Sequence, residues 1–205
     1  MYIPKTNLMT DKGEILAFMK QFSFATVITA SQGIPIATHL PFIVATHEEN
    51  IILSSHFARA NEHWRNIETA EVLVIFSEPH AYISTKKYDR EVNVPTWNYI
   101  SIHAYGRGRL ITDAAETLAA LEKTIDSYEP EYRKQWDNFP PEYKSKMSKG
   151  IVAFEIEVTD LQAKKKLSQN RTLTERGKIV DTLSNSNQPN DQLIAKFMRA
   201  DLKHN

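Results

Sequence analysis

The stretch PTWNYISIHAYGRGRLI, residues 95–111, alternates aromatic or polar residues with small or aliphatic ones. A period of two predicts a long β-strand with two distinct faces. One face would carry Trp97, Tyr99, Ser101, His103 and Tyr105, and the other Asn98, Ile100, Ile102 and Ala104. Gly106 and Gly108 stand where a strongly curved strand needs a bulge or a bend. Curvature of this kind lets a sheet close on itself, so the stretch predicts a barrel.

Shorter β-branched runs precede this strand and are separated by turn residues such as Ser31-Gln32-Gly33. They predict strands at 24–30, 34–45, 51–56, 71–77 and 80–84. Apolar residues at helical spacing predict an opening helix at 11–22, and one or two helical turns are expected at 61–67. Several short strands at hairpin spacing favour an antiparallel meander over a parallel sheet.

The pattern changes to a helical period after the long strand. Asp113 is suited to N-capping, and Leu118, Leu121 and Ile125 follow at helical spacing, which predicts a helix at 113–128. Short helices are expected up to Gly150, then two final strands separated near Thr159-Asp160, and terminal helices at 173–183 and 192–202. The fold class expected from these elements is α+β, a small antiparallel barrel with flanking helices.

Composition excludes several classes of site. The chain has 205 residues and no cysteine, so disulfides, zinc–thiolate sites, iron–sulfur clusters and thiol nucleophiles are ruled out. The signatures of P-loop, Rossmann, serine-hydrolase and zinc-protease sites are absent, and the seven histidines lack ligand spacing, so no metal site is expected. No stretch approaches the roughly 20 apolar residues that span a bilayer. A cytoplasmic protein without a membrane partner is expected.

Charge is balanced over the whole chain but uneven along it. There are 25 basic and 25 acidic residues, whereas residues 161–205 carry 9 basic and 4 acidic ones. This local excess either contacts nucleic-acid phosphates or forms the solvated face of terminal helices. Because neutral overall charge gives no broad electrostatic footprint, DNA is a possible but weakly supported partner, with the segments 172–184 and 191–202 as its candidates.

Polar residues at strand ends are the first candidates for a binding site. Ser54, Ser55 and His56 end one predicted strand, and Arg59 and Asn61 follow at once. A phosphate group needs a cation with a fixed fork of donors plus hydroxyl and backbone donors, which this segment supplies. The alternative is that His56 and Asn61 are only turn and cap residues.

Two further segments have equally open interpretations. The aromatic face of the long strand suits a flat heteroaromatic ring, although such stripes also form a core or a dimer interface. The run Lys164–Arg171, KKKLSQNR, precedes a helix and either closes over a phosphate or forms a solvated basic turn.

Several segments together resemble the PaiB family, also called the FMN-binding negative transcriptional regulators. The segments are MYIPK at 1–5, GIPIATHLPF at 33–42, SSHFARANEHW at 54–64, VLVIFSEPHAYIS at 72–84, VPTWNYISIHAYGRGRL at 94–110 and KLSQNR at 166–171. The resemblance implies an FMN-binding split antiparallel β-barrel, of the kind shared with pyridoxamine-phosphate oxidases and flavin reductases. It also implies a homodimer with the flavin between subunits, and repression of sporulation and degradative-enzyme genes.

The resemblance assigns residues to the cofactor FMN. Thr38, His39 and Leu40 would face the flavin ring. Ser55, His56, Arg59 and Asn61 would lie at the phosphate, and Trp97 and His103 would come from the long strand, of the same or the partner subunit. One departure is visible: where the family commonly shows Asn-Pro-Gln-Trp, this chain has Asn61-Glu62-His63-Trp64.

The expected organisation is a split-barrel domain over 1–170, with inserted helices at about 113–149, and a C-terminal helical extension over 171–205. The expected function is an FMN-binding homodimeric transcriptional regulator. A flavin- or haem-dependent oxidoreductase of the same superfamily is the alternative, because fold does not fix function.

Overall fold

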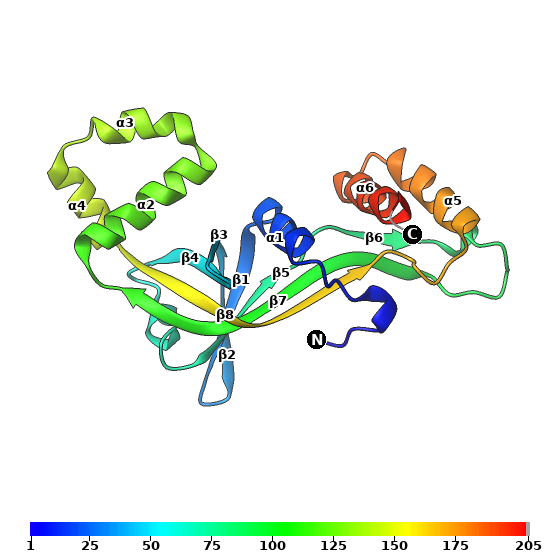
Figure 1. The fold of residues 1–205 in the computed structure, drawn as a ribbon, viewed down its shortest axis with the longest axis horizontal. Coiled ribbons are helices and arrows are strands. Elements are labelled where there is room, and N and C mark those ends of the chain that lie inside the picture. The colour runs from blue at the N-terminus through cyan, green and yellow to red at the C-terminus, as the bar shows by residue number, and fades with distance from the viewer. Residues whose placement is uncertain (204–205) are drawn as a thin grey trace. The chain divides into compact units, whose positions relative to one another are not determined.

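The computed structural model describes residues 1–203, whose eight strands form one sheet in the order β2-β1-β5-β7-β8-β4-β3, with β6 paired to β7 (Figure 1). The strands are β1 (Phe24–Ser31), β2 (Ile34–Pro41), β3 (Ile43–His47), β4 (Asn50–Ala58), β5 (Glu71–Phe76), β6 (His80–Ile83), β7 (Thr96–Ile111) and β8 (Ile151–Lys166). The α-helices are α1 (Lys12–Gln21), α2 (Ala114–Tyr128), α3 (Arg133–Asp137), α4 (Pro141–Lys149), α5 (Leu173–Ser184) and α6 (Pro189–Lys203). The 3₁₀ turns are η1 (Lys5–Asn7), η2 (Glu62–Asn66), η3 (Thr85–Lys87) and η4 (Pro130–Tyr132). None of the helices described is long and apolar enough to cross a membrane.

Contacts group these residues into two compact units. The barrel unit comprises Leu16–Phe76 and His103–Leu161, and the helical unit comprises Met1–Ile15, Ser77–Ile102 and the chain from Gln162 onward. The expected division into residues 1–170 and 171–205, whose last two residues lie outside the described part, stays a prediction.

The barrel unit curls because of one junction in the chain. Strands β2 and β3 are the two ends of the strand order, yet only Phe42 separates them in sequence. The prediction of a single strand at 34–45 was therefore wrong, since β2 pairs with β1 and β3 pairs with β4. A sheet whose two ends are joined by one residue must bend round on itself. The expected α+β fold with a split antiparallel barrel is confirmed, as an open sheet with helices.

Phe42 also anchors the barrel core. It is 1% exposed, and its ring centroid lies 6.1 Å from those of Phe76 and Phe154. Phe57 stacks on Phe154 at 4.8 Å. Aromatic pairs at these separations contribute beyond the apolar area they bury. The junction between the two ends of the sheet is thus fixed by packing.

The two glycines of β7 allow close approach to neighbouring backbone. A Cβ on Gly106 would lie 2.2 Å from the carbonyl oxygen of Glu157, and one on Gly108 would lie 2.6 Å from that of Ile67. Real Cβ atoms do not approach oxygen so closely, so only glycine fits at either position. The strand continues through both glycines to Ile111.

The final strands predicted on either side of Thr159-Asp160 are a single strand, β8. The prediction of a break was wrong because this pair contains neither glycine nor proline, and Thr159 is β-branched and favours extended backbone. The hydroxyl of Thr159 lies 3.4 Å from the carbonyl oxygen of Tyr105 on β7, so the two strands stay together at this point.

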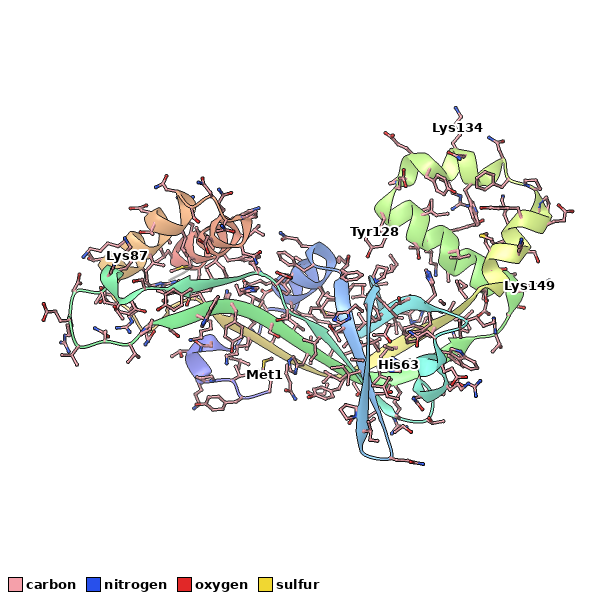
Figure 2. All side chains as sticks on the ribbon, turned by 180° about the vertical axis from the view of Figure 1, so that it is seen from behind. Met1, His63, Lys87, Tyr128, Lys134 and Lys149 are labelled. Atoms are coloured by element: carbon pink, nitrogen blue, oxygen red, sulfur yellow. The ribbon has the colours of Figure 1, made fainter. Side chains whose placement is uncertain are left out.

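Helices occupy the connection between β7 and β8, as Figure 1 shows for α2, α3 and α4. The predicted N-cap is confirmed: the carboxylate of Asp113 accepts hydrogen bonds from the amides of Ala115 and Glu116, both at 2.9 Å. Near the other end of α2 lies Tyr128, labelled in Figure 2. Its hydroxyl lies 2.7 Å from that of Ser23. The Tyr128 hydroxyl thus joins the end of α2 to the segment just before β1.

The helical unit is a short sheet covered by α5 and α6. Strand β6 pairs with the first part of β7, from His80 opposite Tyr99 to Ile83 opposite Thr96. Helix α6 packs on β6 and against α5. Arg176 of α5 forms a buried ion pair with Asp201 of α6, with Nη2 and Oδ2 2.6 Å apart. The predicted terminal helices at 173–183 and 192–202 are confirmed as α5 and α6.

Candidate functional site

A cleft of about 230 Å³ lies in the barrel unit between strand β4 and helix α2. We call it the His56 cleft. Its lining residues are Ile43, Ser54, Ser55, His56, Arg109, Ile111, Glu116, Ala119, Ala120, Lys123, Thr124 and Glu155. Two residues predicted at the phosphate, Ser55 and His56, therefore belong to the lining of this cleft. Alternation along β4 leaves Ser54 and His56 partly exposed, whereas Ser55 points inward.

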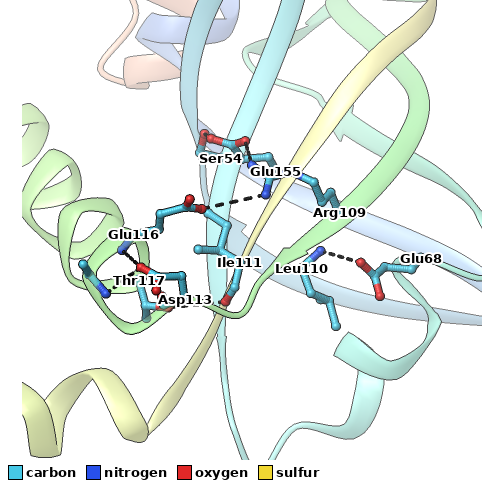
Figure 3. Close-up of polar contacts among 10 residues, drawn as sticks. Ser54, Glu68, Arg109, Leu110, Ile111, Asp113, Glu116, Thr117 and Glu155 are labelled. Atoms are coloured by element: carbon cyan, nitrogen blue, oxygen red, sulfur yellow. Dashed lines mark hydrogen bonds and ion pairs between the residues drawn. The ribbon is translucent and has the colours of Figure 1, made fainter.

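The charged groups of the His56 cleft come from β7, β8 and α2. A guanidinium nitrogen of Arg109 lies 2.9 Å from Glu155 and another lies 3.8 Å from Glu116 (Figure 3). The Arg109 side chain is 62% exposed, so these ion pairs are weak and the guanidinium can turn toward an anion at little cost. Lys123 supplies a second cation in the lining. The cleft thus offers two cations and several hydroxyl groups, together with the carboxylates of Glu116 and Glu155, which pair with Arg109.

Ser55 and His56 differ in what they can offer a ligand. The hydroxyl of Ser55 is buried and donates to the carbonyl oxygen of Pro41 at 2.7 Å, which secures the chain just before Phe42. Burial lowers the pKa of His56, so the imidazole is neutral at pH 7 and can both donate and accept a hydrogen bond. Of the two, His56 is the group suited to ligand contact.

Arg59 lies in a different hollow, of about 350 Å³, which it lines with Trp64, Thr112, Lys149 and others. Its guanidinium donates to the carbonyl oxygens of Lys149 at 2.7 Å and Ile151 at 2.8 Å. These bonds tie the end of β4 to the start of β8. The structure therefore does not bring Arg59 together with Ser55 and His56, and its role as a phosphate ligand stays a prediction.

His63, labelled in Figure 2, is one of the two residues that depart from the family pattern, and Asn61 and Thr38 meet in a network centred on it. The two ring nitrogens of His63 lie 3.0 Å and 2.8 Å from the hydroxyls of Thr29 and Thr38. Asn61 donates to Thr38 at 3.2 Å and caps η2 through the amide of His63 at 3.1 Å. Burial lowers the pKa of His63. The network holds β2 against η2, while His39 and Leu40 follow Thr38 on the same strand.

Trp97 and His103 belong to different units. Trp97, in the helical unit, is 52% exposed and contacts Tyr82 with ring centroids 5.6 Å apart. His103, in the barrel unit, is half-buried, and its Nδ1 is buried without a hydrogen-bond partner among the described residues. Burial lowers the pKa of His103. Their predicted contact with the flavin stays a prediction.

Arg109, Lys123 and His63 were not among the residues predicted for the site. Arg109 follows His103 by an even number of residues on β7, so the two side chains lie on the same face of the strand. The alternation that defined the aromatic face therefore also predicts the face of Arg109. Lys123 gave no signal, since its part in the cleft depends on how α2 packs beside β4.

Residues 1–160 match the family model described as "Putative FMN-binding domain". The chain is 42% identical over 206 residues to the Bacillus subtilis "Protease synthase and sporulation protein PAI 2", covering 99% of both chains. It is 28% identical to an uncharacterized protein of Emericella nidulans, covering 80% of both.

Solved structures share the fold at low sequence identity. The flavocytochrome Anf3 of Azotobacter vinelandii matches with a TM-score of 0.62 and 17% identity, over 80% of this chain and 72% of that one. A FAD- and heme-binding protein of Mycobacterium smegmatis matches with a TM-score of 0.60 and 15% identity, over 78% and 73%. The sequence match over most of the chain and the open barrel together show that this chain belongs to the family described as "Putative FMN-binding domain".

Proposed function

We propose that this chain is a cytoplasmic, homodimeric, FMN-binding regulator of the PaiB type. The observation that carries the proposal is the 42% identity to PAI 2 of Bacillus subtilis over 99% of both chains. Agreement over whole lengths, including the C-terminal helices beyond residue 160, supports a shared role in addition to a shared fold.

The donor set of the His56 cleft fits a phosphate monoester. Arg109 and Lys123 supply positive charge, and Ser54, Thr124 and the neutral His56 supply hydrogen bonds. We place the FMN phosphate here, with Ser55 holding the strand in position. Arg59 and Asn61 act from outside the cleft, by fixing the end of β4 and the β2–η2 junction.

The size of the cleft favours two chains at one cofactor. Sites that enclose a drug-sized ligand span roughly 300–1,000 Å³, and the His56 cleft has about 230 Å³. It can take the phosphate end of FMN but leaves the ring in need of another wall. We assign that wall to Thr38, His39 and Leu40, with Trp97 and His103 contributed by a second chain. When bound, FMN supplies a redox-active ring that can report the redox state of its surroundings.

Flavin binding is tested by titrating the purified chain with FMN and following flavin fluorescence. Arg109→Met and Lys123→Met each remove one cation, and Arg65→Met on η2 is the control with the same loss of charge outside the cleft. Loss of a charge-assisted hydrogen bond costs about 1.5–3 kcal/mol, so each cleft variant should bind FMN about 10- to 100-fold more weakly. Failure of the unaltered chain to bind FMN would overturn the proposal.

Two further measurements separate the regulator from the alternative. Light scattering after size exclusion should give the mass of a dimer. Mixing with reduced nicotinamide dinucleotide and FMN should give no multiple turnover across several acceptors, whereas sustained oxidation would assign the chain to the oxidoreductases instead.

A further inference from the structure

The hollow that contains Arg59 lies wholly within the barrel unit, and we call it the Arg59 hollow. Its volume is about 350 Å³, within the range of roughly 300–1,000 Å³ that is typical of small-molecule pockets. Strands β7 and β8, turn η2 and helices α2 and α4 contribute to its lining, of which Leu110, Ile111 and Thr117 are labelled in Figure 3. Only Ile111 also lines the His56 cleft, so the two hollows are separate candidate sites.

The lining of the Arg59 hollow carries positive charge without a carboxylate. Arg59 and Lys149 supply two cations, and none of the described residues in the lining is an aspartate or a glutamate. Within residues 1–203, neither cation forms an ion pair. In the His56 cleft, by contrast, Arg109 is paired with two carboxylates. An anion that enters the Arg59 hollow therefore meets two cations and no like charge from the lining.

Arg59 is held in place in a way that leaves three of its five donors unused. Its Nε donates to the carbonyl oxygen of Lys149 at 2.7 Å, and its Nη2 donates to that of Ile151 at 2.8 Å. Both hydrogens of Nη1 and the second hydrogen of Nη2 remain. One from each nitrogen forms a parallel fork that can bind a carboxylate through both oxygens. Because the backbone bonds fix the guanidinium beforehand, less conformational entropy is lost when a ligand binds.

Most other polar side chains of the lining have already used their donors. The hydroxyls of Thr117 and Ser148 donate to backbone carbonyl oxygens at 2.8 Å and 3.0 Å. The indole N–H of Trp64 donates to the carbonyl oxygen of Arg59 at 3.2 Å. The side-chain donors left for a ligand are therefore the guanidinium fork, the ammonium group and the hydroxyl of Thr112. This set suits a single anionic group.

Apolar side chains form the rest of the wall. Ile111 and Val152 are buried, and Leu110 and Trp64 are partly exposed. Such a surface favours a hydrocarbon or aromatic body, because burying it removes apolar area from water. An inorganic anion would use the cations but leave this wall uncovered. A purely apolar molecule would cover the wall but leave the cations unpaired.

We propose that the Arg59 hollow binds a small organic acid, whose carboxylate pairs with Arg59 and Lys149 and whose apolar body lies against Trp64 and the aliphatic wall. The inference goes beyond the proposed function, which places the FMN phosphate in the His56 cleft. The resemblance to PaiB proteins assigns Arg59 to that phosphate instead. Competition between FMN and the acid is therefore part of the test.

The test is calorimetric titration of the whole chain with 3-phenylpropionate, with tryptophan emission as a second readout. This probe has a carboxylate and an apolar ring. Acetate lacks the ring, and 3-phenylpropanamide lacks the charge. The acid should bind at least about tenfold more tightly than either, because each comparison compound makes only one of the two kinds of contact.

Lys149→Met should weaken binding of 3-phenylpropionate about tenfold or more. Lys149 is the cation to replace, because Arg59 also ties the end of β4 to the start of β8. Lys146→Met is the matched control, since Lys146 is an exposed lysine of the same helix that does not line the hollow, and it should leave the affinity unchanged. Trp64→Phe should abolish most of the change in emission.

Failure of millimolar 3-phenylpropionate to bind, equal affinity for the acid and its amide, or unchanged binding in Lys149→Met would overturn the proposal. So would an emission change that persists in Trp64→Phe, because the probe would then lie near another tryptophan. Displacement of the acid by FMN or by inorganic phosphate would also overturn it, since the hollow would then be a phosphate site. Titration with FMN alone tests the proposed function separately, so a chain that binds FMN but not the acid contradicts only the present inference.

Discussion

Truncation of Phe42 should destabilise the chain more than most single substitutions, because this side chain holds together the two ends of the sheet. Phe42 is 1% exposed and contacts the rings of Phe76 and Phe154. Buried Phe→Ala substitutions cost about 3–5 kcal/mol, from lost apolar burial plus the cavity left behind. A domain of this kind has about 5–15 kcal/mol of stability in total. Phe42→Ala should therefore remove a large fraction of the free energy of unfolding.

The matched control is Phe24→Ala, because Phe24 begins β1 and is 65% exposed. An exposed substitution of this kind changes stability by within about 0.5 kcal/mol. Urea denaturation followed by circular dichroism, at one protein concentration, measures the free energies of unfolding of both variants, and thermal denaturation measures their midpoint temperatures. At about 2–4 °C per kcal/mol for a chain of this length, the midpoint of Phe42→Ala should fall by roughly 6–20 °C. A loss below about 1 kcal/mol for Phe42→Ala, or equal losses for the two variants, would refute the role assigned to this junction.

Three further outcomes are expected. Burial lowers the pKa of His63 below its unfolded value of 6.5, so folding favours the neutral imidazole. The stabilising contribution of His63 is therefore complete above pH 6.5 and is lost as the pH falls. The urea midpoint should drop from about pH 7.5 to about pH 5.5, and it should drop less in His63→Gln. Gly106→Ala should destabilise the chain through the 2.2 Å clash with Glu157, whereas Gly177→Ala in α5, with open space at its Cβ, should stabilise by about 0.5–1 kcal/mol; equal thermal midpoints would contradict both. Asp113→Ala should cost about 1 kcal/mol by removing the α2 cap, and an unchanged midpoint would mean that the two hydrogen bonds to Asp113 do not stabilise the helix.

Local sequence signals predicted the elements well wherever the cause of structure is itself local. The alternation in 95–111 gave β7 within one residue of its start, and Asp113 marked the beginning of α2. The turn at Gln32-Gly33 is confirmed as well, with φ of 52° and 79°. Turn residues and the periodic spacing of apolar residues affect only the backbone a few positions away, so they can be recognised in a single sequence.

The predictions failed where pairing partners decide the structure. Nothing local separates 34–41 from 43–47, since the break at Phe42 exists because the two parts pair with different strands. Similarly, Thr159-Asp160 resembled a turn until pairing with β7 carried the strand through it. The prediction for Arg59 assumed that neighbours in sequence share one site, yet its guanidinium is bound to carbonyl oxygens about ninety residues away.

The sequence by itself determined the α+β class, the order of the elements and the absence of thiol chemistry, because composition and periodicity depend only on the chain. Tertiary structure alone decided that the cations beside Ser55 and His56 are Arg109 and Lys123. A binding site is a property of distances between residues far apart in the chain, and those distances exist only once the sheet has curled.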